Sequence, residues 1–100
     1  FNRFIDLVNK FGATERRIDF YASQLLLSPN HLSTLIKSYS GQTVMDWVNR
    51  ATLLQAKILL RHTNLMSYEI AYRLNFSEPT AFNRYFKQHT GITPMQYRKE

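Results

Sequence analysis

Two short stretches of the chain carry polar side chains that could bind nucleic acid, and their pattern is nearly the same. The stretches are "SPNHLSTLIK", which ends at Lys37, and "SEPTAFNRYFK", which ends at Lys87. Each begins with a Ser and a nearby Pro and ends with a run of the form apolar-polar-polar-apolar-apolar-Lys. On a helix, the polar positions of such a run share one face. Asn can pair with adenine and Arg with guanine through two hydrogen bonds, whereas Lys suits phosphate. The two runs therefore predict two helix surfaces that bind DNA.

The predicted contact residues lie on the solvent side of these runs. Those expected to contact bases are Asn30, His31, Ser33 and Thr34 in the first run and Pro79, Thr80, Asn83 and Arg84 in the second. Those expected to contact phosphates are Lys37 and Lys87, with Ser28, Thr43, Ser77 and Thr93 at helix starts whose amides could bind an anion. For these four hydroxyl residues, plain helix capping is the favoured role.

No grouping of side chains predicts catalysis or a metal site. Side-chain catalysis needs a nucleophile with its base or a pair of carboxylates, but Asp46, Glu69 and Glu78 all fall where carboxylates cap or begin helices. The three histidines share no ligand spacing, and the chain has no cysteine. The sequence predicts neither an enzyme nor a cofactor.

Helices must position the two runs, because strand-like alternation is missing and apolar residues recur at helical spacing. We expect an all-α fold of about seven helices in a single domain over residues 1–100. A first helix ends at Gly12, a first helix-turn-helix covers about 16–41, a linker helix about 43–61, a second helix-turn-helix about 67–91 and a short terminal helix about 94–99. The linker helix is apolar nearly all round and is expected to be packed on more than one side.

Helix caps and core positions follow from the same pattern. Ser28, Ser67 and Ser77 are expected N-caps, and Thr43 with Asp46 and Thr93 with Gln96 have the form of capping boxes. In the first run Leu32, Leu35, Ile36 and Tyr39 are expected in the core. Arg50, Lys57 and Arg61 form a basic seam on the linker helix, where solvation or intramolecular pairing is favoured over DNA contact.

The two halves of the chain correspond by a constant offset. Ala22 and Ala71 are 49 residues apart, as are Ser28 and Ser77, whereas Lys37 and Lys87 are 50 apart. One residue has therefore been added in the second turn, near Pro79. Each copy reads as short helix, turn, longer helix, which is the outline of a helix-turn-helix. A linker of ~28 Å would let the two longer helices enter successive major grooves, which lie roughly 34 Å apart.

Length and charge agree with this interpretation. One hundred residues suit one domain, and a net charge of +6 makes nucleic acid the first candidate partner. The alternative is a protein-interaction module whose basic charge is incidental. The longest aliphatic run, 25–27, cannot cross a membrane, and with no cysteine and no signal peptide we expect a cytoplasmic protein with no membrane partner.

The stretch "SYEIAYRLNFSEPTAFNRYFKQHTGITPMQYR", residues 67–98, resembles the DNA-binding domain of the AraC/XylS family of bacterial transcription regulators. Its Ile-Ala, Asn-Phe-Ser, Phe-x-x-x-Phe-Lys and Thr-Gly-x-Thr-Pro-x-x-Tyr-Arg elements carry the resemblance. The first half matches more loosely.

The resemblance implies two helix-turn-helix units that bind adjacent major grooves of double-stranded promoter DNA. RNA polymerase is an implied partner, and the intact protein is expected to have an N-terminal effector or dimerisation domain. Arg84 stands where the family often has a base-reading Arg. Thr34 stands at the matching position of the first unit, where Arg is common, and Thr52 stands where the family usually has a basic residue.

Overall fold

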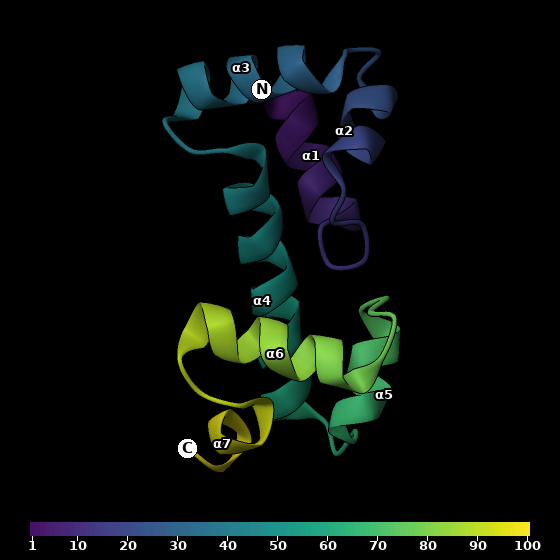
Figure 1. The fold of residues 1–100 in the computed structure, drawn as a ribbon, viewed down its shortest axis with the longest axis vertical. Helices are drawn as coiled ribbons and strands as arrows, with labels where there is room; N and C mark the ends of the chain where they lie inside the picture. Colours follow the sequence, from purple (N-terminus) through teal and green to yellow (C-terminus); the bar gives the residue numbers. More distant parts are fainter. The chain divides into compact units, whose positions relative to one another are not determined.

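The computed structural model describes all 100 residues and contains seven helices and no strand. The helices are α1 (Asn2–Phe11), α2 (Ile18–Gln24), α3 (Pro29–Ser40), α4 (Val44–His62), α5 (Ser67–Arg73), α6 (Pro79–Thr90) and α7 (Pro94–Lys99). Their order along the chain can be followed in Figure 1. The predicted all-α fold, with two helix-turn-helix units joined by a long helix, is confirmed.

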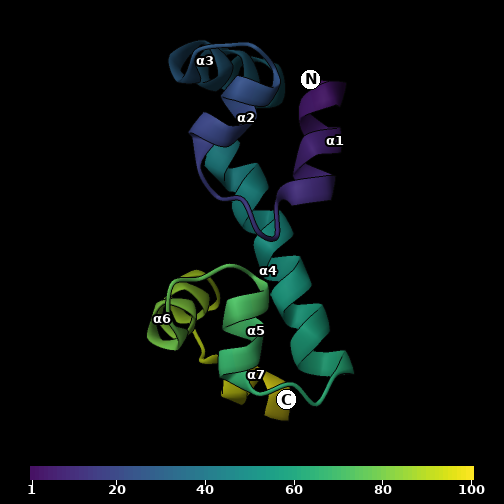
Figure 2. The same cartoon turned by 90° about the vertical axis from the view of Figure 1, so that its right-hand side faces the viewer.

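The chain divides into two compact units, and the division falls within α4. Unit 1 is Phe1–Thr52 and unit 2 is Leu53–Glu100. In unit 1 the short helix α2 packs beside α3, and in unit 2 the short helix α5 packs beside α6 (Figures 1 and 2). Each unit therefore has a supporting helix followed by a longer second helix.

The turns between these helix pairs have matching backbones. Leu26 and Asn75 both adopt positive φ, at 58° and 63°. In the first turn the Leu27 amide donates to the Ala22 carbonyl at 2.9 Å, and in the second the Phe76 amide donates to the Ala71 carbonyl at 2.9 Å. Up to this point the offset is 49, but α3 and α6 begin at 29 and 79, an offset of 50. The added residue thus lies between positions 76 and 79.

Three of the predicted caps are confirmed. The Ser28 hydroxyl accepts from the His31 amide at 3.1 Å. In the first capping box the Thr43 amide donates to Asp46 Oδ2, and the Asp46 amide donates to Thr43 Oγ1, both at 3.0 Å. Thr93 and Gln96 form the corresponding box at the start of α7. The amide of Thr43 lowers the pKa of the Asp46 carboxyl, because it stabilises the charged form.

Two predicted caps are wrong. Ser67 is the first residue of α5, and Glu69 Oε1 accepts from the preceding Met66 amide at 2.8 Å. Ser77 lies two residues before α6, and Glu78 occupies the cap position without a side-chain hydrogen bond. The residue added in the second turn explains why Ser77 differs from Ser28, because it separates Ser77 from the start of α6.

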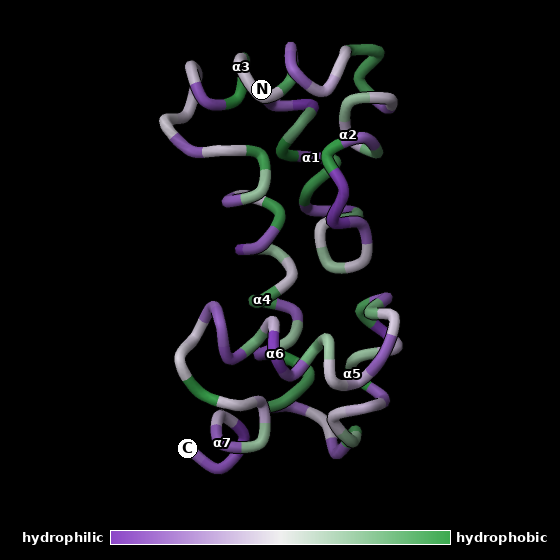
Figure 3. The backbone as a smooth tube through the Cα atoms, viewed as in Figure 1, coloured by the Kyte–Doolittle hydropathy of each residue, from purple (hydrophilic) through white to green (hydrophobic).

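Each unit has its own small apolar core. In unit 1 the most buried side chains include Phe4, Val8, Tyr21, Ala22, Leu32, Ile36, Val44 and Val48; in unit 2 they include Ala56, Leu60, Ile70, Ala71, Leu74, Phe82 and Phe86. Figure 3 shows hydrophobic and hydrophilic stretches alternating along α3 and α4, as expected for helices with one buried side. The Tyr21 hydroxyl donates to the Glu15 carbonyl at 2.6 Å, and burial raises the pKa of Tyr21 to about 12.

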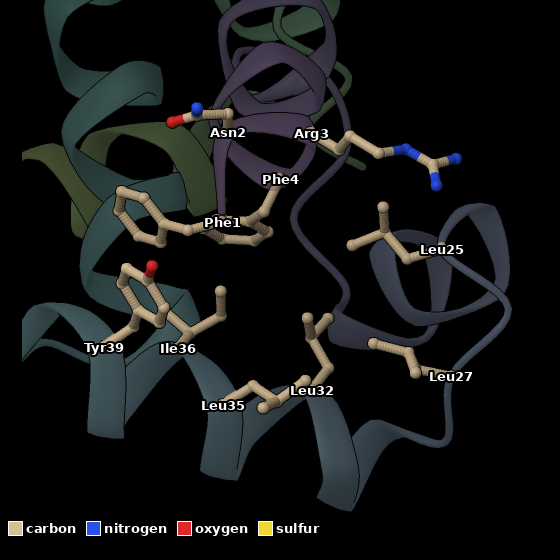
Figure 4. Close-up of a pocket in the computed structure, with 10 residues that line it drawn as sticks. All are labelled: Phe1, Asn2, Arg3, Phe4, Leu25, Leu27, Leu32, Leu35, Ile36 and Tyr39. Atoms are coloured by element: carbon tan, nitrogen blue, oxygen red, sulfur yellow. The ribbon is translucent and has the colours of Figure 1, made fainter.

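The predicted burial of Leu35 and Tyr39 is wrong. Their exposed fractions are 42% and 77%, and both line an open groove of about 430 Å³ (Figure 4). The ring of Phe1 stacks on that of Tyr39 at 5.5 Å between centroids, so Tyr39 is covered on one face only. The other helices of unit 1 cover Leu32 and Ile36 but leave Leu35 and Tyr39, on the neighbouring side of α3, exposed.

The apolar surface of α4 is not covered all round, since Leu54 and Ile58 are 60% and 42% exposed. On the buried side of α4, Thr52 is completely covered, and its hydroxyl donates to the Gly12 carbonyl at 2.5 Å. No helix in the chain combines the length and apolar character needed to cross a membrane.

Candidate nucleic-acid interface

The outward face of α3 holds four predicted contact residues. Ser28 caps the helix, Pro29 takes its first position and Gly41 ends it in the left-handed conformation at φ 78°. Asn30, Ser33, Thr34 and Lys37 are all exposed, and their spacing of three and four residues puts them on one side. Leu32 and Ile36 on the opposite side are buried, which fixes the rotation of the helix.

The outward face of α6 is built in the same way. Thr80, Asn83, Arg84 and Lys87 are exposed at the positions 50 residues later. Phe82 and Phe86 are completely buried beneath them, and Gly91 ends the helix at φ 86°. We call the four outward residues of each helix, at 30, 33, 34 and 37 in α3 and at 80, 83, 84 and 87 in α6, its recognition face. Neither helix contains an acidic residue, so nothing on them opposes the approach of a polyanion.

Two predicted base-contact residues lie beside these faces. His31 is exposed but is turned by about 100° from Asn30, since each helical residue advances by that angle. Pro79 is the first residue of α6 and is half-buried. The structure thus brings the other six predicted base-contact residues together on two faces and leaves these two at the margins.

Hydrogen bonds within each unit distinguish the two recognition faces. In unit 1 the Thr34 hydroxyl donates to the Asn30 carbonyl at 3.0 Å, and Lys37 Nζ donates to the Gly41 carbonyl at 3.1 Å. In unit 2 the Ser67 hydroxyl of α5 donates to Asn83 Oδ1 at 3.0 Å. Sequence reasoning missed the role of Ser67, because Ser before a helical run is typical of a cap. Comparison of the two copies did offer a signal. The residue that matches Ser67 in unit 1 is the apolar Ile18, so a capping hydroxyl is not a shared feature of this position.

The hydroxyl residues predicted at phosphate positions have different structural roles. Ser28, Thr43 and Thr93 each accept a hydrogen bond from an amide of their own helix start. Ser77 is exposed and caps no helix. For the first three, the capping role is therefore confirmed.

The basic seam on α4 is paired within the protein. The Arg50 guanidinium lies 4.9 Å from the Trp47 ring and donates to Gln42 Oε1 at 3.1 Å. The Arg61 guanidinium lies 4.3 Å from the ring of Tyr97, and Lys57 Nζ lies 5.9 Å from the same ring. The intramolecular alternative for this seam is confirmed. No cluster of three or more potential metal ligands exists in the chain.

Comparison with known proteins places this geometry in a family. The family described as "Helix-turn-helix domain" matches residues 21–100. The regulatory protein PocR of Salmonella typhimurium is 37% identical over 84 residues, which make up 84% of this chain and 28% of PocR. This chain thus spans less than a third of the length of that relative.

Solved structures agree. The C-terminal domain of the two-component response regulator yesN from Fusobacterium nucleatum superposes with a TM-score of 0.89 and 28% identity, over 97% of this chain and 95% of that one. The DNA-binding domain of the transcriptional factor AdpA, solved with a target DNA, superposes with a TM-score of 0.84 over 98% of this chain and 88% of that one. At 21% identity, AdpA supports the fold alone.

These matches cover both units and confirm the resemblance found in the sequence. The family consists of bacterial transcription regulators rather than enzymes. The chain is an AraC-type helix-turn-helix DNA-binding domain of the kind found in transcription regulators.

Proposed function

We propose that this chain binds double-stranded promoter DNA in a sequence-specific manner, with α3 and α6 entering adjacent major grooves. The observation that carries the proposal is the pair of matching recognition faces. Each consists of four exposed polar residues at the same helical positions, above two buried anchors, on a helix without acidic residues. In a helix-turn-helix protein such a face is the part that lies in the groove.

Within this proposal, some residues of the recognition faces contact base edges and others bind phosphates. Arg84 reads guanine, because its guanidinium can donate two parallel hydrogen bonds to O6 and N7. Thr80, Asn83, Asn30 and Ser33 read neighbouring base edges. Lys37 and Lys87 bind phosphate, which positions the protein without reading sequence.

Thr34 gives the first recognition face less discriminating power than Arg84 gives the second. Its hydroxyl hydrogen is donated to the Asn30 carbonyl, so the methyl group and the oxygen lone pairs remain for a base. We therefore expect unit 2 to read its box more strictly than unit 1.

The test is selection from a random duplex pool, followed by fluorescence anisotropy of the selected duplex over a salt series. We expect two conserved boxes about one helical turn apart, and an affinity that falls steeply with salt because counterions leave the DNA. A protein-interaction module would instead give no selected sequence and a flat response to salt. That result would exclude DNA as the partner.

Arg84→Ala is the matching variant. It should relax base preference at one position of one box and lower affinity by about 1–3 kcal/mol. Arg73→Ala is the control, because Arg73 is exposed on α5 and its removal changes net charge equally. The control should weaken binding to all sequences alike. Equal base preferences in the two variants would remove Arg84 from the reading role.

The intact protein is expected to have further parts and partners. This chain spans 28% of PocR, and we propose that an N-terminal effector or dimerisation domain precedes the DNA-binding domain in the whole regulator. RNA polymerase is the proposed partner at the promoter and the cytoplasm the proposed compartment. Purification of the whole regulator, followed by promoter footprinting with and without polymerase, tests both the domain and the partner.

A further inference from the structure

Ser67 on α5 contacts a predicted base-reading residue on α6. Its hydroxyl donates to Asn83 Oδ1 at 3.0 Å, between residues 16 positions apart. Ser67 is half-buried at the first position of α5, whereas Asn83 is exposed on the recognition face. A residue of the supporting helix therefore holds the side-chain amide that faces the DNA in the proposed complex.

Unit 1 has no equivalent of this hydrogen bond. The residue matching Ser67 is Ile18, the first residue of α2, and the residue matching Asn83 is Ser33. An isoleucine side chain has no donor, so it cannot orient a polar group on α3. The Ser67–Asn83 pair is thus a specific feature of unit 2 and not a general property of the repeated fold.

The hydrogen bond decides which half of the amide faces outward. Oδ1 accepts while Nδ2 donates, and the two atoms project on opposite sides of the planar group. When Oδ1 is turned toward Ser67 on α5, Nδ2 is turned away from α5. Asparagine reads adenine by presenting both atoms together, the oxygen to N6 and the nitrogen to N7. Ser67 occupies one of the two lone pairs of Oδ1 and keeps the oxygen turned toward α5, so the donor half is the half of the amide that is turned away from α5.

We infer that Ser67 is a positioning residue that makes Asn83 select a base acceptor rather than adenine. This inference rests on the proposed function. The N–H groups of Asn83 meet guanine O6 or N7, or thymine O4, all of which are acceptors in the major groove. Adenine is disfavoured because the amide oxygen, turned toward Ser67, is then not aligned with the N6 amino group while Nδ2 meets N7.

The experiment compares base preferences of the full 100-residue chain and its variants, measured by duplex selection. Asn83→Ala should flatten the preference at one base pair, which identifies the position that Asn83 reads. At that position the unaltered chain should select guanine or thymine. Ser67→Ala frees the amide and should raise the relative affinity for adenine there about five-fold or more, the lower end of the discrimination of a two-bond contact. Ser67→Thr keeps the hydroxyl and should keep the original preference.

Controls separate positioning from stability. Ser33→Ala removes the matching residue of unit 1 and should leave the Asn83 position unchanged. Ser67→Cys retains the side-chain shape but offers only a weak donor, so it gives the same comparison if the alanine variant does not fold. Side-chain amide NMR of the free protein adds a readout without DNA. The Asn83 amide should have a lower order parameter in both the Ala and Cys variants than in the unaltered chain.

The outcomes distinguish this inference from the function on which it rests. If the chain selects no sequence, both fall. If it selects two boxes but Ser67→Ala and Ser67→Cys leave the Asn83 position unchanged, or if Asn83→Ala changes no position, DNA reading stands and the role of Ser67 is refuted.

Discussion

The hydroxyl of Thr52 donates a hydrogen bond of 2.5 Å to the backbone carbonyl of Gly12, across 40 residues of chain. The same oxygen lies 3.1 Å from the Val48 carbonyl one turn earlier on α4. Thr52 is completely buried, so this bond satisfies a carbonyl that water does not reach from that side. The Thr52–Gly12 hydrogen bond thus links the C-terminal end of α1 to the middle of α4 within unit 1.

Replacement of Thr52 by Val keeps the shape of the side chain but removes the hydroxyl. The Gly12 carbonyl then loses its partner, and we expect a loss of about 1–3 kcal/mol in the free energy of unfolding. Urea unfolding followed by circular dichroism measures it. The matched control is Thr34→Val, since Thr34 makes a similar bond to its own helix but is exposed. Equal losses in the two variants would show that the contact with Gly12 has no special weight.

Gly12 is required for space rather than for its backbone conformation. Its φ is −61°, which any residue adopts, but an added Cβ would lie 2.5 Å from the Val8 carbonyl oxygen on α1 and 2.7 Å from the Ala51 Cβ on α4. Gly12→Ala should therefore push α1 and α4 apart and destabilise the protein by about 1–3 kcal/mol.

Gly41 provides the opposite case. Its φ is 78° and an added Cβ would meet no atom within 4 Å, so only the backbone is strained by a side chain there. Asparagine tolerates this conformation, and Gly41→Asn should cost less than Gly41→Ala. At Gly12, Asn should be no better than Ala, because there the clash is steric. Thermal melting of the four variants tests this pattern.

The first capping box should give the protein a pH-dependent contribution to stability that the second lacks. The pKa of Asp46 is lowered in the folded state, chiefly by the Thr43 amide, so its contribution is complete above the unfolded pKa of about 3.9. That contribution is lost as the pH falls through the folded value. The melting-temperature gap between the unaltered chain and Asp46→Ala should thus shrink under acid conditions.

Gln96→Ala is the control for this pH dependence, because Gln96 holds the matching position in the second box and does not titrate. Its gap should stay constant over the same pH range. A gap for Asp46→Ala that is equally constant would contradict the lowered pKa.

Thr34→Arg should introduce a guanine contact in unit 1. Thr34 and Arg84 occupy the same outward position, 50 residues apart, above the buried pairs Leu32–Ile36 and Phe82–Phe86. The new guanidinium should add guanine preference at one position of the box read by α3, worth about 1–3 kcal/mol. Thr34→Lys adds the same charge without the planar fork and should raise affinity for all sequences without that preference. Duplex selection with the two variants distinguishes them.

Much of the fold could be predicted because its signals are local. Ser28, Thr43 and Thr93 are followed three residues later by the group that completes each cap, so the sequence contains the whole interaction. The constant offset between the copies likewise predicted the turns and the glycine ends. Ser77 failed because one added residue moves a cap away from its helix without changing the local letters.

The remaining errors involve partners far away in the chain. Leu35 and Tyr39 follow the helical period of Leu32 and Ile36, but burial depends on whether another element covers them, and here a groove remains. For the candidate site, the outward positions followed from periodicity, whereas the Ser67 hydroxyl reaches Asn83 only through the packing of α5 on α6. Spacing along the sequence does not encode such a contact.

The equal length of α3 and α6, each of 12 residues that begin with Pro and are followed by a left-handed Gly, makes the two helices suitable for exchange of specificity. The outward side chains can be transplanted without altering the buried anchors, since both sets project from the same helical positions. A chain with Thr80, Asn83, Arg84 and Lys87 copied onto α3 should favour a DNA site that contains one box twice. Ile18→Ser belongs in the same transplant, because Asn83 comes with its orienting hydroxyl. Each helix-turn-helix unit could then serve as an exchangeable module from which DNA-binding domains of chosen sequence preference are built.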